Sequence, residues 1–301
     1  MAADTYRATP GRLDGVLVAL TGQPRADIQR AIAAGAVTVD GTVRPKAYRL
    51  GGGERLVLDS REPTAIEPEP GDPVPIRYRD EHIVVIAKPA GLVVHPTANR
   101  RGGTLVSRLM AMGVPLAPAG GELRPGIAHR LDAGTSGLMI VASSDVALAG
   151  LQGSFRHHAI DRRYLALVRG APAHDVFSVH APLGRRAARV VVDRLDGREA
   201  ATTFERREAL AGCTLLEAIP STGRTHQIRV HLNAVGHPIV GDRAYGGVGE
   251  LSRHLGLGRQ FLHSWRLAFD HPITGERLDI EEPLADDLAA ALAVARADLR
   301  P

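Results

Sequence analysis

A proline-rich, acidic stretch over residues 61–75 divides this chain of 301 residues into two parts. Proline has no backbone N–H and fixes its own φ angle, so a run of closely spaced prolines continues neither a helix nor a central strand. We therefore expect an extended linker here. It would join a small domain over residues 10–60, preceded by a flexible tail over residues 1–9, to a large domain over residues 76–301.

The small N-terminal domain is expected to be an α/β module. Apolar residues recur at helical spacing over residues 13–20 and again over residues 28–32, which predicts two short helices. Residues 37–43 alternate around an Asp-Gly pair, and this pair between alternating residues is a strong signal for a two-residue hairpin turn. Residues 56–58 predict a closing strand.

The large domain mixes short strands with helices. Runs that are β-branched or alternate between apolar and polar residues predict strands, whereas longer amphipathic or alanine-rich stretches predict helices. Hairpin-like spacing among the strands favours an α+β fold, with a mixed, mostly antiparallel central sheet flanked by helices. The expected strands are 83–87, 138–142, 164–168, 190–192, 200–205 and 214–219, and the expected helices are 105–112, 146–157 and 284–299.

The loop before the 138–142 strand combines one acid with several small residues. Its sequence over positions 129–137 is HRLDAGTSG. Glycine admits positive φ angles and close approach of another backbone, and loops on a rigid scaffold often carry function. By local pattern alone Asp132 is either a turn-stabilising acid or a catalytic one. Ser136 lacks the Gly-x-Ser-x-Gly elbow of a hydrolase nucleophile, and the sequence suggests no partner base for it.

This loop resembles the signature loop of the RluA family of RNA pseudouridine synthases, and the resemblance runs from about residue 12 to residue 284. It implies that Asp132 is the catalytic residue of a pseudouridine synthase fold. The implied reaction breaks the bond from ribose carbon 1′ to uracil nitrogen 1 and rejoins the base through carbon 5. No atom is gained or lost, so we expect no cofactor. The target uridine must leave its stack first.

Two further motifs resemble that family. The strand motif RRYLALV puts Tyr164 where the family's tyrosine packs against the target base. Tyr164 is therefore expected among the catalytic residues, and its hydroxyl, or water near it, is a candidate to assist removal of the carbon 5 proton. The segment GRTHQIR over residues 223–229 matches the motif whose last arginine pairs with the catalytic acid, which implies Arg229 beside Asp132. Thr225 is expected to cap the helix that follows. The expected RNA contacts of this domain are Arg130, Arg224, His226 and Gln227.

The N-terminal module resembles the S-four-like RNA-binding domain. That domain presents arginines of its second helix and cations of its hairpin to RNA, although a solvated charged face is the simpler interpretation of such residues. Many family members have Ser-Arg where this chain has Pro24-Arg25, so one hydroxyl contact to phosphate is lost. The residues expected to bind RNA are Arg25, Arg30, Arg44 and Lys46.

Composition permits a nucleic-acid partner. The formal net charge is +4, and all but two of the 37 basic residues are arginines, although coding bias explains most of this preference. A single cysteine excludes an internal disulfide and fits a reducing, cytoplasmic setting. We expect a monomer, with no membrane contact. Three histidines invite a metal site, but their spacings do not stack on one helical face, so none is predicted. They are His226, His231 and His237.

Together these patterns predict an enzyme that isomerises uridine in RNA. The layout is closest to the RluD-like enzymes of the family, which suggests large-subunit ribosomal RNA, of the 23S type, as the substrate. Transfer RNA is the alternative substrate, and an inactive RNA-binding protein on the same fold is the alternative function. A hydrolase that uses Asp132 or Ser136 is a third possibility, and it would release a product.

Overall fold

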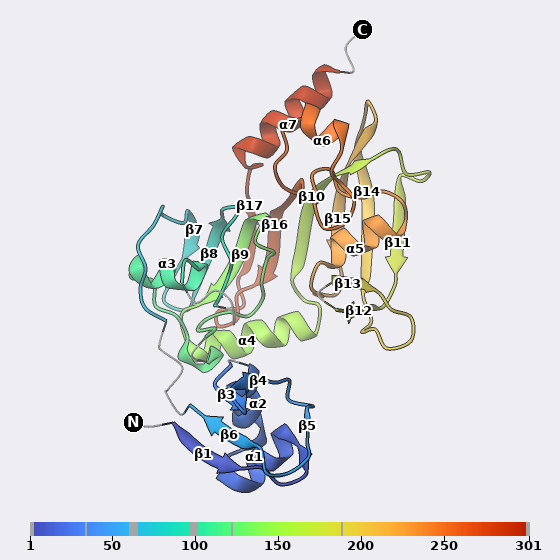
Figure 1. Ribbon diagram of the computed structural model, residues 1–301. Coiled ribbons are helices and arrows are strands. Elements are labelled where there is room, and N and C mark those ends of the chain that lie inside the picture. The colour runs from blue at the N-terminus through green and yellow to red at the C-terminus, as the bar shows by residue number, and fades with distance from the viewer. Residues whose placement is uncertain are drawn as a thin grey trace. The chain divides into compact units, whose positions relative to one another are not determined.

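The computed structural model forms two compact units (Figure 1). The first runs to Glu67 and includes Pro96 and Gly102, whereas the second comprises Pro68–His95 and the chain from Gly103 onward. The division between Glu67 and Pro68 falls inside the stretch expected to be a linker, whose residues 61–65 lie outside the described part. The described residues are 3–33, 35–59, 66–96, 102–121, 123–187 and 189–298.

The N-terminal unit is a small antiparallel sheet with two helices. Its four-stranded sheet has the order β1 (Asp4–Arg7), β6 (Arg55–Leu58), β3 (Val37–Val39) and β4 (Thr42–Val43). A second pair joins β2 (Gly11–Arg12) to β5 (Arg49–Leu50). Helices α1 (Leu13–Thr21) and α2 (Arg25–Ala33) contribute Leu13, Leu17 and Ile28, which are fully buried, to one core with the strands.

Two sequence predictions for this unit have different outcomes. The hairpin is confirmed, because β3 pairs with β4 through Asp40 and Gly41, whose positive φ angles of 47° and 79° suit a type I′ turn. The flexible tail over residues 1–9 is wrong for Asp4–Arg7. This segment pairs along its length with β6, and Tyr6 packs against the core. This segment of four residues is too short for its alternation to predict a strand.

The large unit is built on one nine-stranded sheet. Every described pair of neighbours is antiparallel except β9 and β16, which run parallel, so the predicted mixed, mostly antiparallel sheet is confirmed. In spatial order the strands are β11 (Val176–His180), β14 (Ala201–Leu210), β15 (Cys213–Pro220), β10 (Asp161–Arg169), β16 (Leu262–Asp270), β9 (Ser136–Ala142), β8 (Ile83–Lys88) and β7 (Ile76–Arg79), and β17 (Arg277–Glu281) pairs with β16.

Helices cover both faces of this sheet. On one face, α4 (Asp145–Arg156) packs against alternate residues of β9 such as Leu138 and Ile140. On the other face, Met139 and Val141 share a core with α3 (Leu105–Ala111), α5 (Gln227–Ala234) and α7 (Asp286–Ala297). Each buried aliphatic side chain contributes about 1.5–3 kcal/mol, which accounts for the apolar run from Leu138 to Ala142 in β9. The remaining elements are the hairpin β12 (Leu183–Arg186) and β13 (Arg189–Val192), the short helix α6 (Glu250–His254) and the 3-10 turn Pro118–Gly120.

The parallel contact between β9 and β16 requires a glycine. Gly137 lies beside Ser264 with φ at 107°, and a Cβ atom there would lie 2.2 Å from the Ser264 carbonyl oxygen. No side chain fits in that space. The close approach expected of the glycines in the HRLDAGTSG loop is thereby confirmed at Gly137, and it fixes where the loop joins the sheet.

Candidate active site

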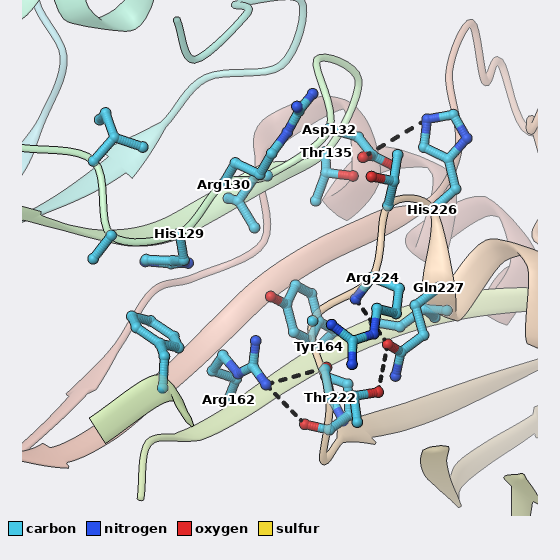
Figure 2. Close-up of a pocket in the computed structure, with 18 of the residues that line it drawn as sticks. His129, Arg130, Asp132, Thr135, Arg162, Tyr164, Thr222, Arg224, His226 and Gln227 are labelled. Atoms are coloured by element: carbon cyan, nitrogen blue, oxygen red, sulfur yellow. Dashed lines mark hydrogen bonds and ion pairs between the residues drawn. The ribbon is translucent and has the colours of Figure 1, made fainter. Parts of the chain in front are cut away.

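A pocket of about 640 Å³ opens in the large unit, within the roughly 300–1,000 Å³ typical of small-molecule sites (Figure 2). The loop before β9, the end of α4, β10 and the segment leading into α5 line it. Among the described lining residues Asp132 is the single carboxylate. Six arginines share the lining with it, namely Arg124, Arg130, Arg156, Arg162, Arg224 and Arg229. The pocket therefore suits an anionic ligand that exposes one polar face to a carboxylate.

The last residue of β8 and the turn that follows it hold the loop that carries Asp132. The Ala133 carbonyl accepts hydrogen bonds from the Gly91 backbone N–H at 2.7 Å and from the Lys88 Nζ at 3.2 Å. Lys88 is almost fully buried, and its ammonium also donates to the carbonyls of Pro89 and Leu92. Burial, helped by the nearby Arg259 charge, lowers the pKa of Lys88 to about 7. The two contacts to Ala133 fix the loop backbone directly after the acid.

Arg229 connects Asp132 to a second, deeply buried acid. Its Nη1 donates to Asp132 Oδ2 at 2.9 Å, so the expected pairing of these two residues is present. The two-pronged contact of Arg229 goes to Asp242, with Nε at 2.7 Å and Nη2 at 2.8 Å from its carboxylate oxygens. Burial opposes the charge on Arg229, but the hydrogen bonds to Asp242 and the charge of Asp132 outweigh it and raise the pKa of Arg229. Arg229 thus stays cationic and directs one oxygen of Asp132.

Tyr164 lies in the pocket wall beneath Asp132 (Figure 2). It is on β10 and is only 7% exposed. Burial raises the pKa of its hydroxyl, although the nearby Arg162 charge opposes this shift. A hydroxyl with a raised pKa keeps its proton, so Tyr164 offers a ring face rather than a base to whatever enters the pocket.

His226 faces the carboxylate oxygen of Asp132 that Arg229 does not hold. Its Nε2 lies 3.8 Å from Asp132 Oδ1 (Figure 2). Its Nδ1 lies 2.9 Å from the Tyr245 hydroxyl. The residue occupies the N-cap position of α5 in the left-handed conformation, with φ at 56°, and its side chain makes no capping hydrogen bond. The expected cap, Thr225, is exposed and does not occupy that position, because the chain turns into the helix one residue later.

The other residues expected to contact RNA in this unit differ in how they are used. Arg130 is exposed at the pocket, and Arg224 lines it while its Nε donates to the Glu199 carbonyl at 3.0 Å. Gln227 is buried, and its amide bonds to four protein groups. Because those bonds use both ends of the amide, we assign Gln227 to bracing the loop before α5, as a correction of the expected RNA contact.

A serine–histidine pair exists that the sequence did not suggest. Ser136 Oγ lies 2.9 Å from His263 Nδ1, and it accepts a hydrogen bond from Arg259 at 3.1 Å. Both residues of the pair are only 2% exposed, and neither lines the pocket. The expectation that Ser136 has no partner is therefore wrong. The pair is nevertheless buried outside the pocket lining, where Arg259 ties it to the Gly134 carbonyl of the loop.

The three histidines considered for a metal have separate partners. His226 faces Asp132, whereas buried His231 lies between the Thr202 hydroxyl and the Ala181 carbonyl, at 2.9 and 3.0 Å. His237 Nδ1 lies 3.0 Å from the Arg169 carbonyl. Across the described ranges, no group of three or more candidate ligands is placed to hold a metal ion.

In the N-terminal unit the expected RNA-binding cations are only partly free. Arg25 donates to the fully buried Asp14 at 3.0 Å, which ties its head to the protein. Arg44 is exposed and lies over the Tyr48 ring at 4.9 Å, and exposed Lys46 reaches the side chain of Gln29. Arg30 is on α2, but its side chain lies outside the described part of the structure. Of these four residues, Arg44 and Lys46 are therefore the ones that remain candidates for RNA contact.

Three residues of the site escaped sequence reasoning. Asp242 was visible only within a glycine-rich stretch, and nothing local distinguishes a buried arginine partner from a turn acid. Tyr245 comes from the same stretch and contacts His226 only in the folded chain. Arg162 lies in the pocket wall and donates to the carbonyls of Pro220 and Thr222, both at 3.2 Å. Within the RRYLALV motif, no local pattern distinguishes Arg162 from the many other arginines of the chain.

Comparison with known proteins gives a consistent result. Residues 82–234 match the protein family described as RNA pseudouridylate synthase, and residues 11–56 match the S4 domain. The ribosomal large subunit pseudouridine synthase D of Zymomonas mobilis is 38% identical over 290 residues, which is 92% of this chain and 91% of that protein. An uncharacterized RNA pseudouridine synthase of Bacillus subtilis, YlyB, is 38% identical over 269 residues, 88% of this chain and 87% of its own length.

A solved structure shares the fold. Human RNA Pseudouridylate Synthase Domain Containing 1 superimposes with a TM-score of 0.58 at 26% sequence identity, covering 74% of this chain and 90% of the human one.

No helix within the described ranges has both the length and the apolar character needed to cross a membrane.

Proposed function

The chain belongs to the RNA pseudouridine synthase family, and from that premise we propose that it converts uridine to pseudouridine in large-subunit ribosomal RNA, with Asp132 as the catalytic carboxylate and without a cofactor. The observation that carries the proposal is the position of Asp132, the one carboxylate among the described residues of a pocket lined by arginines. Such a pocket attracts the RNA backbone and presents a single anionic group to the nucleotide inside.

The geometry supports a reaction at the ribose. Asp132 is 16% exposed, so it remains reachable from the pocket, and Arg229 holds one of its oxygens while the other stays available. That free oxygen acts on the sugar, either as base or as nucleophile at carbon 1′. In the second case its bond to carbon 1′ breaks when carbon 5 attacks, and the carboxylate is restored. The bond to nitrogen 1 then breaks, the detached uracil turns, and carbon 5 bonds to carbon 1′. Tyr164 stacks on the extruded base and contributes roughly 1–3 kcal/mol.

Two findings favour ribosomal RNA as substrate. Full-length relatives at 38% identity are named for the ribosomal large subunit, and they cover the N-terminal unit as well as the catalytic one. The match to the S4 domain supports an RNA-binding role for that unit, in which Arg44 and Lys46 are among the exposed cations. An enzyme with this substrate would work in the cytoplasm. Transfer RNA remains the alternative substrate.

The test is release of tritium from transcripts labelled at uracil carbon 5, with a metal chelator present and no nucleotide added. Wild type should release tritium from large-subunit ribosomal RNA and not from transfer RNA, whereas Asp132→Asn should release none while binding RNA normally. Asp279→Asn is the matched control, because it changes an exposed acid outside the pocket and should behave as wild type.

Each other outcome excludes one part of the proposal. Release by Asp132→Asn would remove that residue's catalytic role, and release only from transfer RNA would change the substrate. Binding without any release would indicate an inactive RNA-binding protein. A dependence on Ser136, with a released base as product, would indicate a hydrolase. The burial of Ser136 outside the pocket lining speaks against that result.

A further inference from the structure

His226 has a strained backbone and an imidazole aimed at the proposed catalytic acid. A non-glycine residue in the left-handed conformation costs about 1–3 kcal/mol and persists only where the surroundings enforce it. Here the conformation brings Nε2 to 3.8 Å from Asp132 Oδ1, on the pocket surface (Figure 2). At that separation the two atoms make no direct hydrogen bond, so each of them stays free to contact a substrate atom that enters the pocket.

The contacts of Tyr245 determine which ring nitrogen of His226 carries the proton. Tyr245 is only 2% exposed, and its hydroxyl has one proton, which it donates to the Val190 carbonyl at 3.1 Å. The contact of 2.9 Å between that hydroxyl and His226 Nδ1 must then be donated by the ring. A neutral imidazole that holds its proton on Nδ1 has its lone pair on Nε2, and that atom faces the pocket.

The surroundings of His226 favour the neutral form. Burial lowers the pKa of the imidazole, and the positive charges of Arg229 and Arg130 act in the same direction. The negative charges of Asp132 and Asp242 oppose the shift without cancelling it. At neutral pH the ring therefore presents a vacant acceptor nitrogen beside the reacting groups.

We propose that His226 accepts the proton that uracil carbon 5 loses during the isomerisation. After carbon 5 has bonded to carbon 1′, it carries both its original hydrogen and the new bond. His226 Nε2 takes that hydrogen as a proton, the C–H electron pair restores the double bond of the ring, and nitrogen 1, which kept the electron pair of the broken glycosidic bond, gains a proton. His226 then returns its own proton to water, so no net oxidation or reduction occurs.

Other groups around the pocket are less suited to this step. The Tyr164 hydroxyl keeps its proton because burial raises its pKa. Lys88 directs its ammonium to three backbone carbonyls and does not line the pocket. Asp132 is the competitor that lies beside His226, 3.8 Å away, and the experiment below separates the two. The inference rests on the proposed function, in which Asp132 acts first at the ribose.

The decisive variant is His226→Gly, which tolerates the positive φ angle and leaves room for a free imidazole. Single-turnover tritium release should fall about 100-fold, the lower end of what a general base supplies, and imidazole in the buffer should restore it at least ~10-fold. The variant should still bind RNA, because the arginines of the pocket remain. Matched His237→Gly, outside the pocket, should be as active as wild type and insensitive to imidazole.

A second variant, His226→Gln, keeps a polar side chain and tests the pH dependence. Wild-type activity should fall as pH drops through the lowered pKa of His226, because protonation removes the acceptor, and His226→Gln should be slow without that acidic limb. Loss of activity that imidazole does not rescue, with the acidic limb intact, would assign the step to Asp132 and overturn the proposal. Absence of tritium release by wild type would instead refute the proposed function.

Discussion

Removing the charge of Asp242 should destabilise the protein far more than removing an exposed acid of the same geometry. Asp242 is fully buried and accepts two hydrogen bonds from Arg229, at 2.7 and 2.8 Å, and two from backbone N–H groups. Asp242→Asn keeps one acceptor oxygen but turns an amide N–H₂ toward the guanidinium. A buried charge that loses its partner costs about 3–5 kcal/mol, and the remaining contact of Arg229 with Asp132 puts our expectation at the lower end, about 3 kcal/mol.

The matched control is Asp279→Asn. Asp279 also accepts a two-pronged contact, from Arg266, but its side chain is 45% exposed. Exposed ion pairs contribute about 0.2–1 kcal/mol, because water and salt screen the charges. The pair of variants thus holds the chemistry constant and changes only burial.

Thermal and urea unfolding of the whole chain measure both variants. For a domain of this size 1 kcal/mol shifts Tm by roughly 2–4 °C, so Asp242→Asn should lower Tm by about 6–12 °C and the control by less than about 4 °C. Asp242→Asn should also slow tritium release, since Arg229 no longer holds a fixed angle to Asp132. Equal losses in the two variants, or a stable Asp242→Asn, would refute the argument that burial of this pair orders the site.

Two further predictions follow from the pocket and from the N-terminal unit. Tyr164→Phe should release tritium within a few-fold of the wild-type rate, because the raised pKa of Tyr164 keeps its hydroxyl protonated. Tyr164→Leu should lose about 10-fold or more in single-turnover rate, because it no longer stacks on the base. A Phe variant as slow as the Leu variant would assign a role to the hydroxyl. Arg44→Ala combined with Lys46→Ala should weaken RNA binding and reduce the slope of log K against log salt by about 1.4–1.8, as measured by titration at several salt concentrations. The choice of uridine should stay unchanged. An altered site of modification would show that the N-terminal unit sets specificity.

The order of elements and several site residues could be read from the chain. Strand β9 is buried at every position, and its run from Leu138 to Ala142 is apolar. Such a short, partly β-branched run predicts a strand buried on both faces. The pair Asp40-Gly41 specified its hairpin through local backbone preference, because both residues tolerate positive φ angles. Asp132 and Arg229 were matched through motifs, and the fold brings them to 2.9 Å although 97 positions separate them.

What the sequence determined by itself were features set by neighbours along the chain: the periodicity of strands and helices, the turns, and the short motifs. Only the tertiary structure decided that Arg229 gives its two-pronged contact to Asp242, that Ser136 is buried against His263, that Gln227 braces a loop, and that Tyr245 orients the His226 ring. The physical reason is that burial and hydrogen-bond partners depend on which distant segments pack together, and a polar side chain looks the same in sequence whether it faces water, a ligand or a buried charge.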